Sequence, residues 1–264
     1  MRKKSLKILL PIYVPVDGRI KNALKHFLRG LVSNLDVRID ITQLGRRFTT
    51  ILIDGNDAEA ASAFLSQEFG TVLTWEDIKF NREYRGFVRS IGENSLYVDI
   101  GLIGEDYFKV EIRFRDFISC IFNIEIEVQK IKRDTFDLFG IRQYFPLYVL
   151  INLNENIDEK NRILRGCLSE RTCKMFRNWI NLRLDKLIVY GATKTQVEKA
   201  IKVSRHFRDV IRIERLGFLE HVITFKWNTS AKGMIKELGP FLPRVSLAPF
   251  YPRMIHKAVR SNSR

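Results

Sequence analysis

The stretch YRGFVRSIGENSLYVDIG, residues 84–101, contains the strongest fold signal in the chain. It has the glycines and branched apolar residues that the first two strands of a small barrel need. Gly86 lets the first strand coil strongly, and Gly101 ends the second strand where the chain has to turn. Successive side chains of a strand point to opposite faces. Four apolar residues are therefore expected to fill the barrel: Val88, Leu96, Val98 and Ile100.

The same alternation leaves Arg85, Phe87, Arg89 and Tyr97 on the outside of the barrel. A surface that mixes aromatic rings with guanidinium groups can stack bases and neutralise phosphates together. The pattern therefore predicts a small S1/OB-like β-barrel whose outer face contacts nucleic acid. The alternative is an ordinary antiparallel hairpin with incidental surface arginines.

Residues 109–115 alternate as cleanly and extend the predicted barrel. The residues expected to point inward are Val110, Ile112 and Phe114, and those expected to point outward are Lys109, Glu111, Arg113 and Arg115. Helical or mixed structure is expected over 118–131, a strand over 147–153, a polar boundary at 154–158 and a basic helix over 169–184.

The segments on both sides of the barrel have the same order of expected elements, strand-helix-strand-strand-helix-strand. Before the barrel, strands are expected at 7–14, 37–42, 48–53 and 71–73, with helices at 19–33 and 58–69. After it, strands are expected at 186–190, 210–215, 221–226 and 245–247, with a helix at 194–204 and another that is capped by Thr229 or Ser230 and ends at Gly239-Pro240. This order is that of the ferredoxin-like split.

The predicted fold class is therefore α+β, with two ferredoxin-like βαββαβ units flanking a small S1/OB-like β-barrel. The expected division is a ferredoxin-like domain over 1–80 and the barrel with its connecting segment over 81–153. The basic helix and C-terminal ferredoxin-like domain follow over 154–248. Residues 249–264 are expected to form a loose basic tail, because prolines and small polar residues accumulate there and no acidic residue follows Glu237.

The composition favours a folded protein with a polyanionic partner. Of the 264 residues 45% are hydrophobic, so the chain can bury a core. Its 45 Lys and Arg against 30 Asp and Glu give a formal net charge of +15. Such an excess favours RNA, DNA or an anionic membrane as a partner, although many basic proteins are simply basic.

Several classes of site and location are not indicated by the sequence. The three cysteines, Cys120, Cys167 and Cys173, form no CxxC pair, which argues against a disulfide scaffold or zinc site and predicts a reducing, cytoplasmic location. No apolar run is long enough for a signal peptide or a membrane span. No phosphate-binding glycine loop occurs, so no cofactor is expected, and the four histidines lack metal-ligand spacing.

Three short motifs carry a resemblance to a known family. They are Arg85-Gly86-Phe87-Val88 with Val98-Asp99-Ile100-Gly101, then Tyr144-Phe145-Pro146-Leu147, and above all Ile213-Glu214-Arg215-Leu216-Gly217-Phe218-Leu219-Glu220. In these the chain resembles an uncharacterised archaeal family, of the domain-of-unknown-function 2110 type, with an S1-like segment between ferredoxin-like units. The resemblance implies an archaeal origin and this architecture, and it implies no reaction.

The candidate nucleic-acid-binding residues come from the barrel and from the basic helix. On the barrel they are Arg85, Phe87, Arg89, Tyr97, Lys109, Arg113 and Arg115. On the helix they are Arg171, Lys174 and Arg177, whose three-residue spacing places them on one side. The alternatives are that Phe87 packs under a neighbouring domain while the arginines pair with Glu83, Glu93 or Asp99, and that the helix has a solvated charged face.

The predicted function is non-catalytic RNA binding, by electrostatic capture followed by ring stacking, in translation or another ribonucleoprotein process. The leading alternative is a protein-interaction adaptor, associated with the ribosome or RNA polymerase, that binds through sheet edges. An enzyme is a third alternative. Glu214, Glu220 and His221 suggest acid–base chemistry, but without a nucleophile or oxyanion donors they are interpreted as exposed charges of a hairpin.

Overall fold

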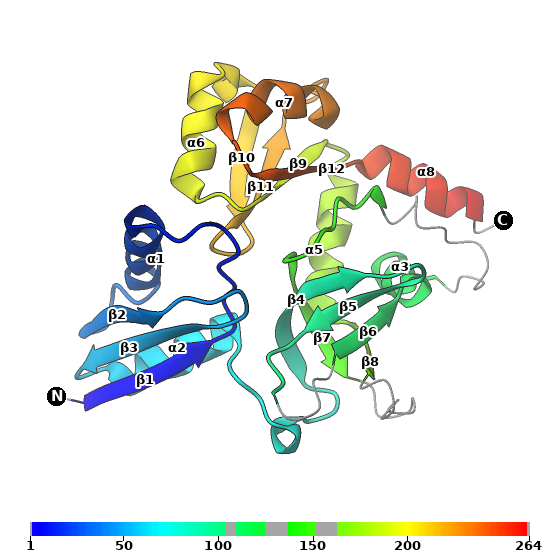
Figure 1. Cartoon of the computed structure of the whole chain (residues 1–264). Helices are drawn as coiled ribbons and strands as arrows, with labels where there is room; N and C mark the ends of the chain where they lie inside the picture. Colours follow the sequence, from blue (N-terminus) through cyan, green and yellow to red (C-terminus); the bar gives the residue numbers. More distant parts are fainter. Residues whose placement is uncertain (1, 104–108, 125–136, 152–162, 263–264) are drawn as a thin grey trace.

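The computed structural model describes residues 2–103, 109–124, 137–151 and 163–262. They form an α+β structure with a three-stranded sheet, a closed five-stranded barrel and a four-stranded sheet. Figure 1 shows these as three units around a common junction: the N-terminal unit in blue, the barrel in green, and the C-terminal sheet in yellow and orange.

The N-terminal unit is built from three antiparallel strands in the order β1-β3-β2 and from two helices. Its elements are β1 (Arg2–Ile8), α1 (Gly18–Leu31), β2 (Val37–Gln43), β3 (Thr49–Gly55) and α2 (Ala58–Phe69). Helix α1 begins where the Asp17 carboxylate accepts a hydrogen bond from the Ile20 N–H at 2.8 Å, as an N-cap residue does. The apolar faces of both helices cover the sheet around Leu24, Leu28 and Leu65.

The closing strand expected at 71–73 is reduced to two isolated bridges. Thr71 pairs with Ile8 of β1, and Leu73 pairs with Leu102 just after the second barrel strand. A short 3-10 turn, Trp75–Asp77, follows and leads into the barrel. This segment therefore ties the N-terminal unit to the barrel instead of completing a fourth strand.

The barrel closes in the order β4-β5-β6-β8-β7. Its elements are β4 (Glu83–Ile91), β5 (Ser95–Asp99), β6 (Lys109–Arg113), α3 (Phe114–Phe122), β7 (Pro146–Ile151) and β8 (Ile163–Leu168). Neighbouring strands are antiparallel except for β6 and β8, which are parallel. Strand β8 places the end of the barrel beyond the boundary set at 153 from the sequence, and the polar stretch 154–158 lies outside the described residues.

The interior of the barrel matches the predicted alternation. Val88, Leu96 and Val98 are fully buried, and Ile100 nearly so. Gly86 is required by close packing, because a Cβ there would lie 2.5 Å from the Asp99 carbonyl oxygen. The expected strand over 109–115 ends earlier: β6 stops at Arg113, and Phe114 is buried as the first residue of α3.

The C-terminal sheet has the antiparallel order β10-β11-β9-β12. Its elements are α5 (Glu170–Asn181), β9 (Lys186–Tyr190), α6 (Lys194–Val203), the 3-10 turn His206–Arg208, β10 (Val210–Arg215), β11 (Glu220–Phe225), α7 (Ala231–Leu238), the 3-10 turn Gly239–Phe241, β12 (Ser246–Phe250) and α8 (Pro252–Asn262). Every residue of β9 and β11 is buried, because α6 and α7 cover one face while α5, α8 and the barrel cover the other. The loose tail expected after 249 is wrong: α8 is a helix that buries Ile255 and Val259.

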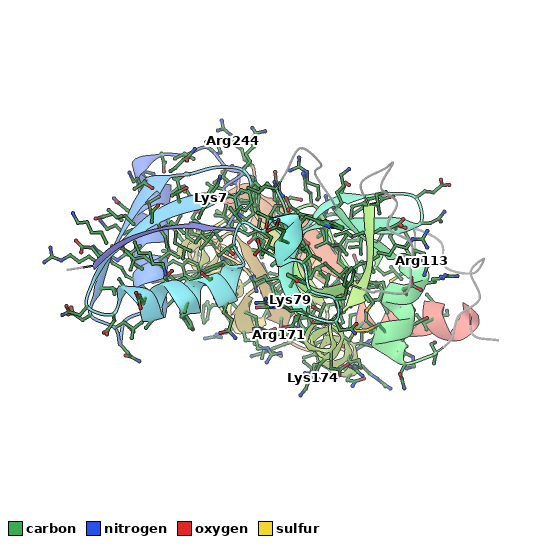
Figure 2. The ribbon with its side chains drawn as sticks, turned by 90° about the horizontal axis from the view of Figure 1, so that it is seen from below. Lys7, Lys79, Arg113, Arg171, Lys174 and Arg244 are labelled. Carbon is green, nitrogen blue, oxygen red and sulfur yellow. A yellow bond between two sulfur atoms is a disulfide. The ribbon has the colours of Figure 1, made fainter. Side chains whose placement is uncertain are left out.

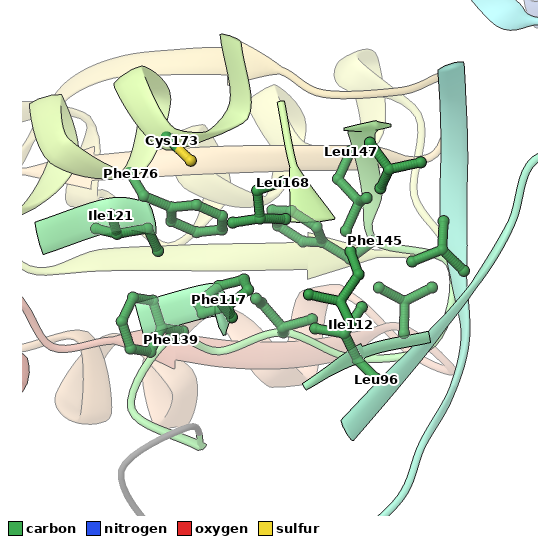
Figure 3. Close-up of a cluster of buried hydrophobic side chains, with 14 of the residues drawn as sticks. Leu96, Ile112, Phe117, Ile121, Phe139, Phe145, Leu147, Leu168, Cys173 and Phe176 are labelled. Atoms are coloured by element: carbon green, nitrogen blue, oxygen red, sulfur yellow. The ribbon is translucent and has the colours of Figure 1, made fainter. Parts of the chain in front are cut away.

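The barrel, α3, α5 and the C-terminal sheet share one apolar core. In Figure 3, Phe117, Phe139, Phe145 and Phe176 meet between the helices and the barrel. Cys173 lies in this core and forms a disulfide with Cys120, joining α5 to α3. The sequence argued against a disulfide scaffold, and one disulfide is nevertheless present, because the fold brings together two residues 53 positions apart. The reducing location inferred from the cysteine spacing loses its support.

Candidate nucleic-acid interface

The outer face of β5 and β6, with the first turn of α3, carries four of the predicted nucleic-acid-binding residues and one glutamate between them. We call it the free face, formed by Tyr97, Lys109, Glu111, Arg113 and Arg115. All five side chains are half-buried, whereas Leu96, Val98, Val110 and Ile112 between them are fully buried. Strand alternation thus presents a ring and several charges on one continuous surface, as predicted.

Tyr97 is the aromatic residue of the free face. Its ring lies across Gly92, where an added Cβ would lie 3.2 Å from Cε2, and the Lys109 Nζ lies 5.8 Å from the ring centroid. Partial burial, and secondarily the neighbouring Glu111 carboxylate, raise the pKa of the Tyr97 hydroxyl, so it stays neutral. A neutral, partly open ring beside an ammonium group can accept a stacked base next to a phosphate.

The charges of the free face are partly neutralised. Asp116 accepts a hydrogen bond from the Arg113 Nε at 2.6 Å and lies 3.2 Å from the Arg115 Nε. Glu111 accepts a hydrogen bond from the Ser95 hydroxyl and lies 3.8 Å from the Arg165 Nε. None of the carboxylates predicted as partners, Glu83, Glu93 or Asp99, forms these pairs.

Arg165 was missed by the sequence analysis. It lies on β8, which pairs with β6 in parallel and brings Arg165 opposite Glu111. The alternation of Leu164, Arg165 and Gly166 would have identified it, had residues 163–168 been recognised as a barrel strand. With the adjoining Arg165 and Asp116, the free face has four cations, Lys109, Arg113, Arg115 and Arg165, and two carboxylates, Glu111 and Asp116.

Phe87 does not belong to this interface. It points away from the barrel interior as predicted, but it is only 3% exposed, and its ring centroid lies 5.7 Å from that of Tyr144. The ring is covered by Tyr144 of the same barrel segment, and the Tyr144 ring in turn stacks on Tyr13 of the N-terminal unit. Phe87 is thus removed from the residues that could stack a base.

Arg85 is also directed to a structural contact. Its guanidinium donates to the Tyr148 hydroxyl and to the Leu216 carbonyl oxygen, both at 2.8 Å, which links the barrel to the C-terminal sheet. Arg171 covers the same Tyr148 ring at 4.0 Å from its centroid. Two of the predicted phosphate-binding arginines therefore hold one tyrosine between them.

The basic helix is separate from the free face. Figure 2 shows Arg171 and Lys174 next to each other, apart from Arg113 and on the side opposite Arg244. Lys174 is exposed, while Arg177 forms an ion pair with Glu170. The fold thus divides the predicted residues between two surfaces.

Arg89 lies at a third place, a cavity of about 1050 Å³ where the three units meet. We call it the junction cavity. Tyr13 lines it, and the Tyr13 hydroxyl donates to the Glu220 carboxylate at 2.5 Å.

Burial raises the pKa of Glu220 to about 7, and burial lowers the pKa of the adjacent His221 to about 4. The two residues were expected to be exposed, but Glu220 is 4% and His221 0% exposed, because both faces of the sheet are covered.

Within the described ranges, no three His, Cys, Asp or Glu side chains are grouped as a metal site. None of the helices described is long and apolar enough to cross a membrane.

Comparison with protein families identifies both flanking segments. Residues 6–74 match the DUF2110 N-terminal domain, and residues 184–247 match the DUF2110 C-terminal domain. These matches cover the N-terminal unit and most of the C-terminal sheet. No curated protein matches the chain.

Proposed function

The chain belongs to the DUF2110 family, and from this starting point we propose that it is a non-catalytic RNA-binding protein. The observation that carries the proposal is the free face: Tyr97 beside Lys109, on the second and third strands of a closed five-stranded barrel. The proposed partner is ribosomal RNA or another ribonucleoprotein RNA.

The strand order supports an S1/OB-like barrel. OB-folds are five-stranded Greek-key barrels, and they bind oligonucleotides on the face of their second and third strands. Here β5 and β6 are the second and third strands, and the helix α3 follows the third. The free face therefore occupies the position at which such barrels bind nucleic acid.

The flanking sheets support the ferredoxin-like part of the architecture. Elements β9 to β12 have the order βαββαβ, with β9 and β11 in the centre of the sheet. The N-terminal unit has the first five of these elements, and the Thr71 bridge occupies the edge where a fourth strand would add. Both units would serve as supports that hold the barrel.

The proposed mechanism has two parts. Lys109, Arg113, Arg115 and Arg165 attract the phosphate backbone, and one base stacks on Tyr97. Electrostatic binding of single strands predicts that log affinity falls with log salt by about 0.7 for each phosphate neutralised. Base stacking on an aromatic ring contributes roughly 1–3 kcal/mol per base.

Replacing Tyr97 by leucine tests the stacking part. We expect Tyr97→Leu to weaken binding of single-stranded RNA roughly 5- to 100-fold, because the ring is lost while an apolar side chain still covers Gly92. The measurement is fluorescence anisotropy with a labelled oligonucleotide at fixed salt. The matched control is Trp227→Leu, since Trp227 is also exposed and lies under an arginine, Arg253 at 4.1 Å, but far along the chain from the barrel.

Equal affinities of Tyr97→Leu and the wild type would contradict binding on the free face. A flat response to salt would contradict the electrostatic part. A loss in Trp227→Leu that equals the loss in Tyr97→Leu would place the RNA elsewhere.

A second candidate function, a protein-interaction adaptor, is favoured by the edge of the C-terminal sheet. Among the described strands, β10 lies at the edge of its sheet and pairs with β11. Ile211 on β10 is 51% exposed, and Phe207 in the preceding 3-10 turn is 58% exposed. An edge strand with exposed apolar side chains can add a strand from a partner. Nuclease treatment before co-purification separates the two functions, because it releases a partner tethered by RNA and retains one docked on β10.

A further inference from the structure

The junction cavity is formed by all three units. Its walls come from the loop before α1, from the end of β4 and residues 142–144 of the barrel, and from the C-terminal sheet at residues 190–191 and 243–246. Its volume of about 1050 Å³ is at the upper end of the roughly 300–1,000 Å³ of typical ligand sites. Because each unit contributes a wall, the cavity exists only in the assembled protein.

Three arginines from two units converge on this cavity: Arg89 and Arg142 from the barrel and Arg244 from the loop before β12. Among the described lining residues, Asp17 is the one carboxylate, and it is engaged as the cap of α1. No described carboxylate forms an ion pair with the guanidinium of Arg142 or Arg244, and both side chains are exposed. The cavity therefore presents positive charge that the protein does not neutralise itself.

The cavity also has a rigid aromatic wall. Tyr13 and Tyr144 stack in parallel, with ring centroids 3.9 Å apart and planes 2° apart. The hydroxyl of Tyr13 is fixed by Glu220, and the ring of Tyr144 packs on Phe87. The wall is thus built from two units and held from behind by buried residues.

Two lining residues have backbone conformations that residues other than glycine rarely adopt. Tyr144 has φ 71° and Arg244 has φ 63°, in the left-handed region. Such strained conformations concentrate at active sites and ligand-binding sites. Here they place an aromatic ring and a guanidinium at the same cavity.

We propose that the junction cavity binds a nucleoside phosphate. Guanidinium groups bind phosphate through paired N–H donors, and a tyrosine wall accepts the flat base. The ligand is either a free mononucleotide or the phosphorylated end of an RNA strand, since both present the same group. The cavity and the free face are different sites, so this proposal stands whether or not the free face binds RNA.

The first experiment compares ligands by isothermal titration calorimetry with the full chain. AMP and UMP are expected to bind at least tenfold more tightly than inorganic phosphate or adenosine, because only the nucleotide uses both the arginines and the wall. Phosphate binding as tight as AMP, or no measurable binding of AMP and UMP at millimolar concentration, would overturn the proposal.

The second experiment tests the residues. Arg142→Gln and Arg244→Gln, made separately, are expected to weaken AMP binding at least tenfold, while the exposed Arg253→Gln leaves it unchanged. Arg244→Lys, which keeps the charge but loses the paired donors, is expected to give an intermediate loss and controls for the backbone strain at this position. Unaltered AMP affinity in both glutamine variants would show that the nucleotide binds outside the cavity.

The third experiment identifies the source of the group. Short RNAs of one sequence with a 5′-phosphate, a 3′-phosphate or neither are compared with AMP. One outcome is that a phosphorylated RNA binds at least tenfold more tightly than the same RNA without a phosphate. If this tenfold preference is lost in Arg244→Gln but kept in Tyr97→Leu, the ligand is an RNA end. Equal binding of all RNAs, with AMP binding retained and sensitive to Arg244→Gln, assigns a free mononucleotide.

Discussion

The side of the barrel that meets the other two units and the free face of the barrel use the same residue types differently. On the junction side, Arg47 of the N-terminal unit donates two hydrogen bonds, at 2.6 and 2.8 Å, to the carboxylate of Asp99, which is fully buried. On the free face, Arg113 and Arg115 share Asp116, and all three side chains are about one-third exposed. One arginine–aspartate arrangement fixes two units together, and the other adjusts the charge of a surface.

Removing Arg47 is expected to have the largest effect. Arg47→Met removes the guanidinium that donates two hydrogen bonds to the buried Asp99 carboxylate, which should lower the free energy of unfolding by about 3–5 kcal/mol. Urea denaturation followed by circular dichroism measures this change. The neighbouring Arg46→Met is the control, because Arg46 is exposed in the same loop.

The comparison can be sharpened by removing the charge that is left behind. Adding Asp99→Asn to Arg47→Met should recover part of the lost stability, since no uncompensated carboxylate remains. Equal destabilisation by Arg47→Met and Arg46→Met would mean that the buried pair does not secure the N-terminal unit to the barrel.

A pH dependence is expected on the junction side and not on the free face. Burial raises the pKa of Glu220 to about 7, so the folded protein holds a proton that the unfolded chain releases near pH 4.5. This contribution to stability is complete below pH 4.5 and is lost as the pH rises to about 7. Relative to the wild type, Glu220→Gln should therefore gain about 2 kcal/mol between pH 5 and pH 8.

The glutamine keeps an oxygen that accepts from Tyr13, so the junction cavity should stay intact. The measurement is urea denaturation of both proteins at pH 5, 6, 7 and 8. Glu93→Gln, an exposed glutamate in the turn between β4 and β5, should track the wild type throughout. A constant difference between Glu220→Gln and the wild type across this range would rule out a buried proton at Glu220.

Strand alternation predicted which side chains fill the barrel and which leave it, because that depends only on local backbone geometry. It could not predict which outer side chains are covered by segments distant in the sequence. Phe87 and Tyr97 look equivalent in the sequence, yet Tyr144, 57 positions after Phe87, buries the one, and the other stays on the free face. Coverage of this kind is set by long-range packing.

The junction cavity had no signal in the sequence. Arg142 and Arg244 lie in loops, and their meeting with Arg89 depends on how three units pack. The pairing of Cys120 with Cys173 was hidden for the same reason, since spacing alone showed no pair. In contrast, the order of strands and helices in the C-terminal sheet followed from hydrophobic periodicity, which is a local signal. The start of α6 is fixed just as locally, by a capping box between Thr193 and Gln196.

The smallest expected effect is on the free face, at the carboxylate that Arg113 and Arg115 share. Asp116→Asn removes the carboxylate that Arg113 and Arg115 share, and exposed pairs of this kind are worth only about 0.2–1 kcal/mol. Stability should therefore barely change, while affinity for single-stranded RNA should rise about two- to threefold at low salt and less at high salt, because the added attraction is screened. Fluorescence anisotropy at two salt concentrations measures this gain.

Asp40→Asn is the matched control, since Asp40 forms an exposed ion pair with Lys25 on the N-terminal unit. A gain of the same size in both variants would reflect net charge alone, and a gain confined to Asp116→Asn would place the RNA backbone next to Arg113 and Arg115.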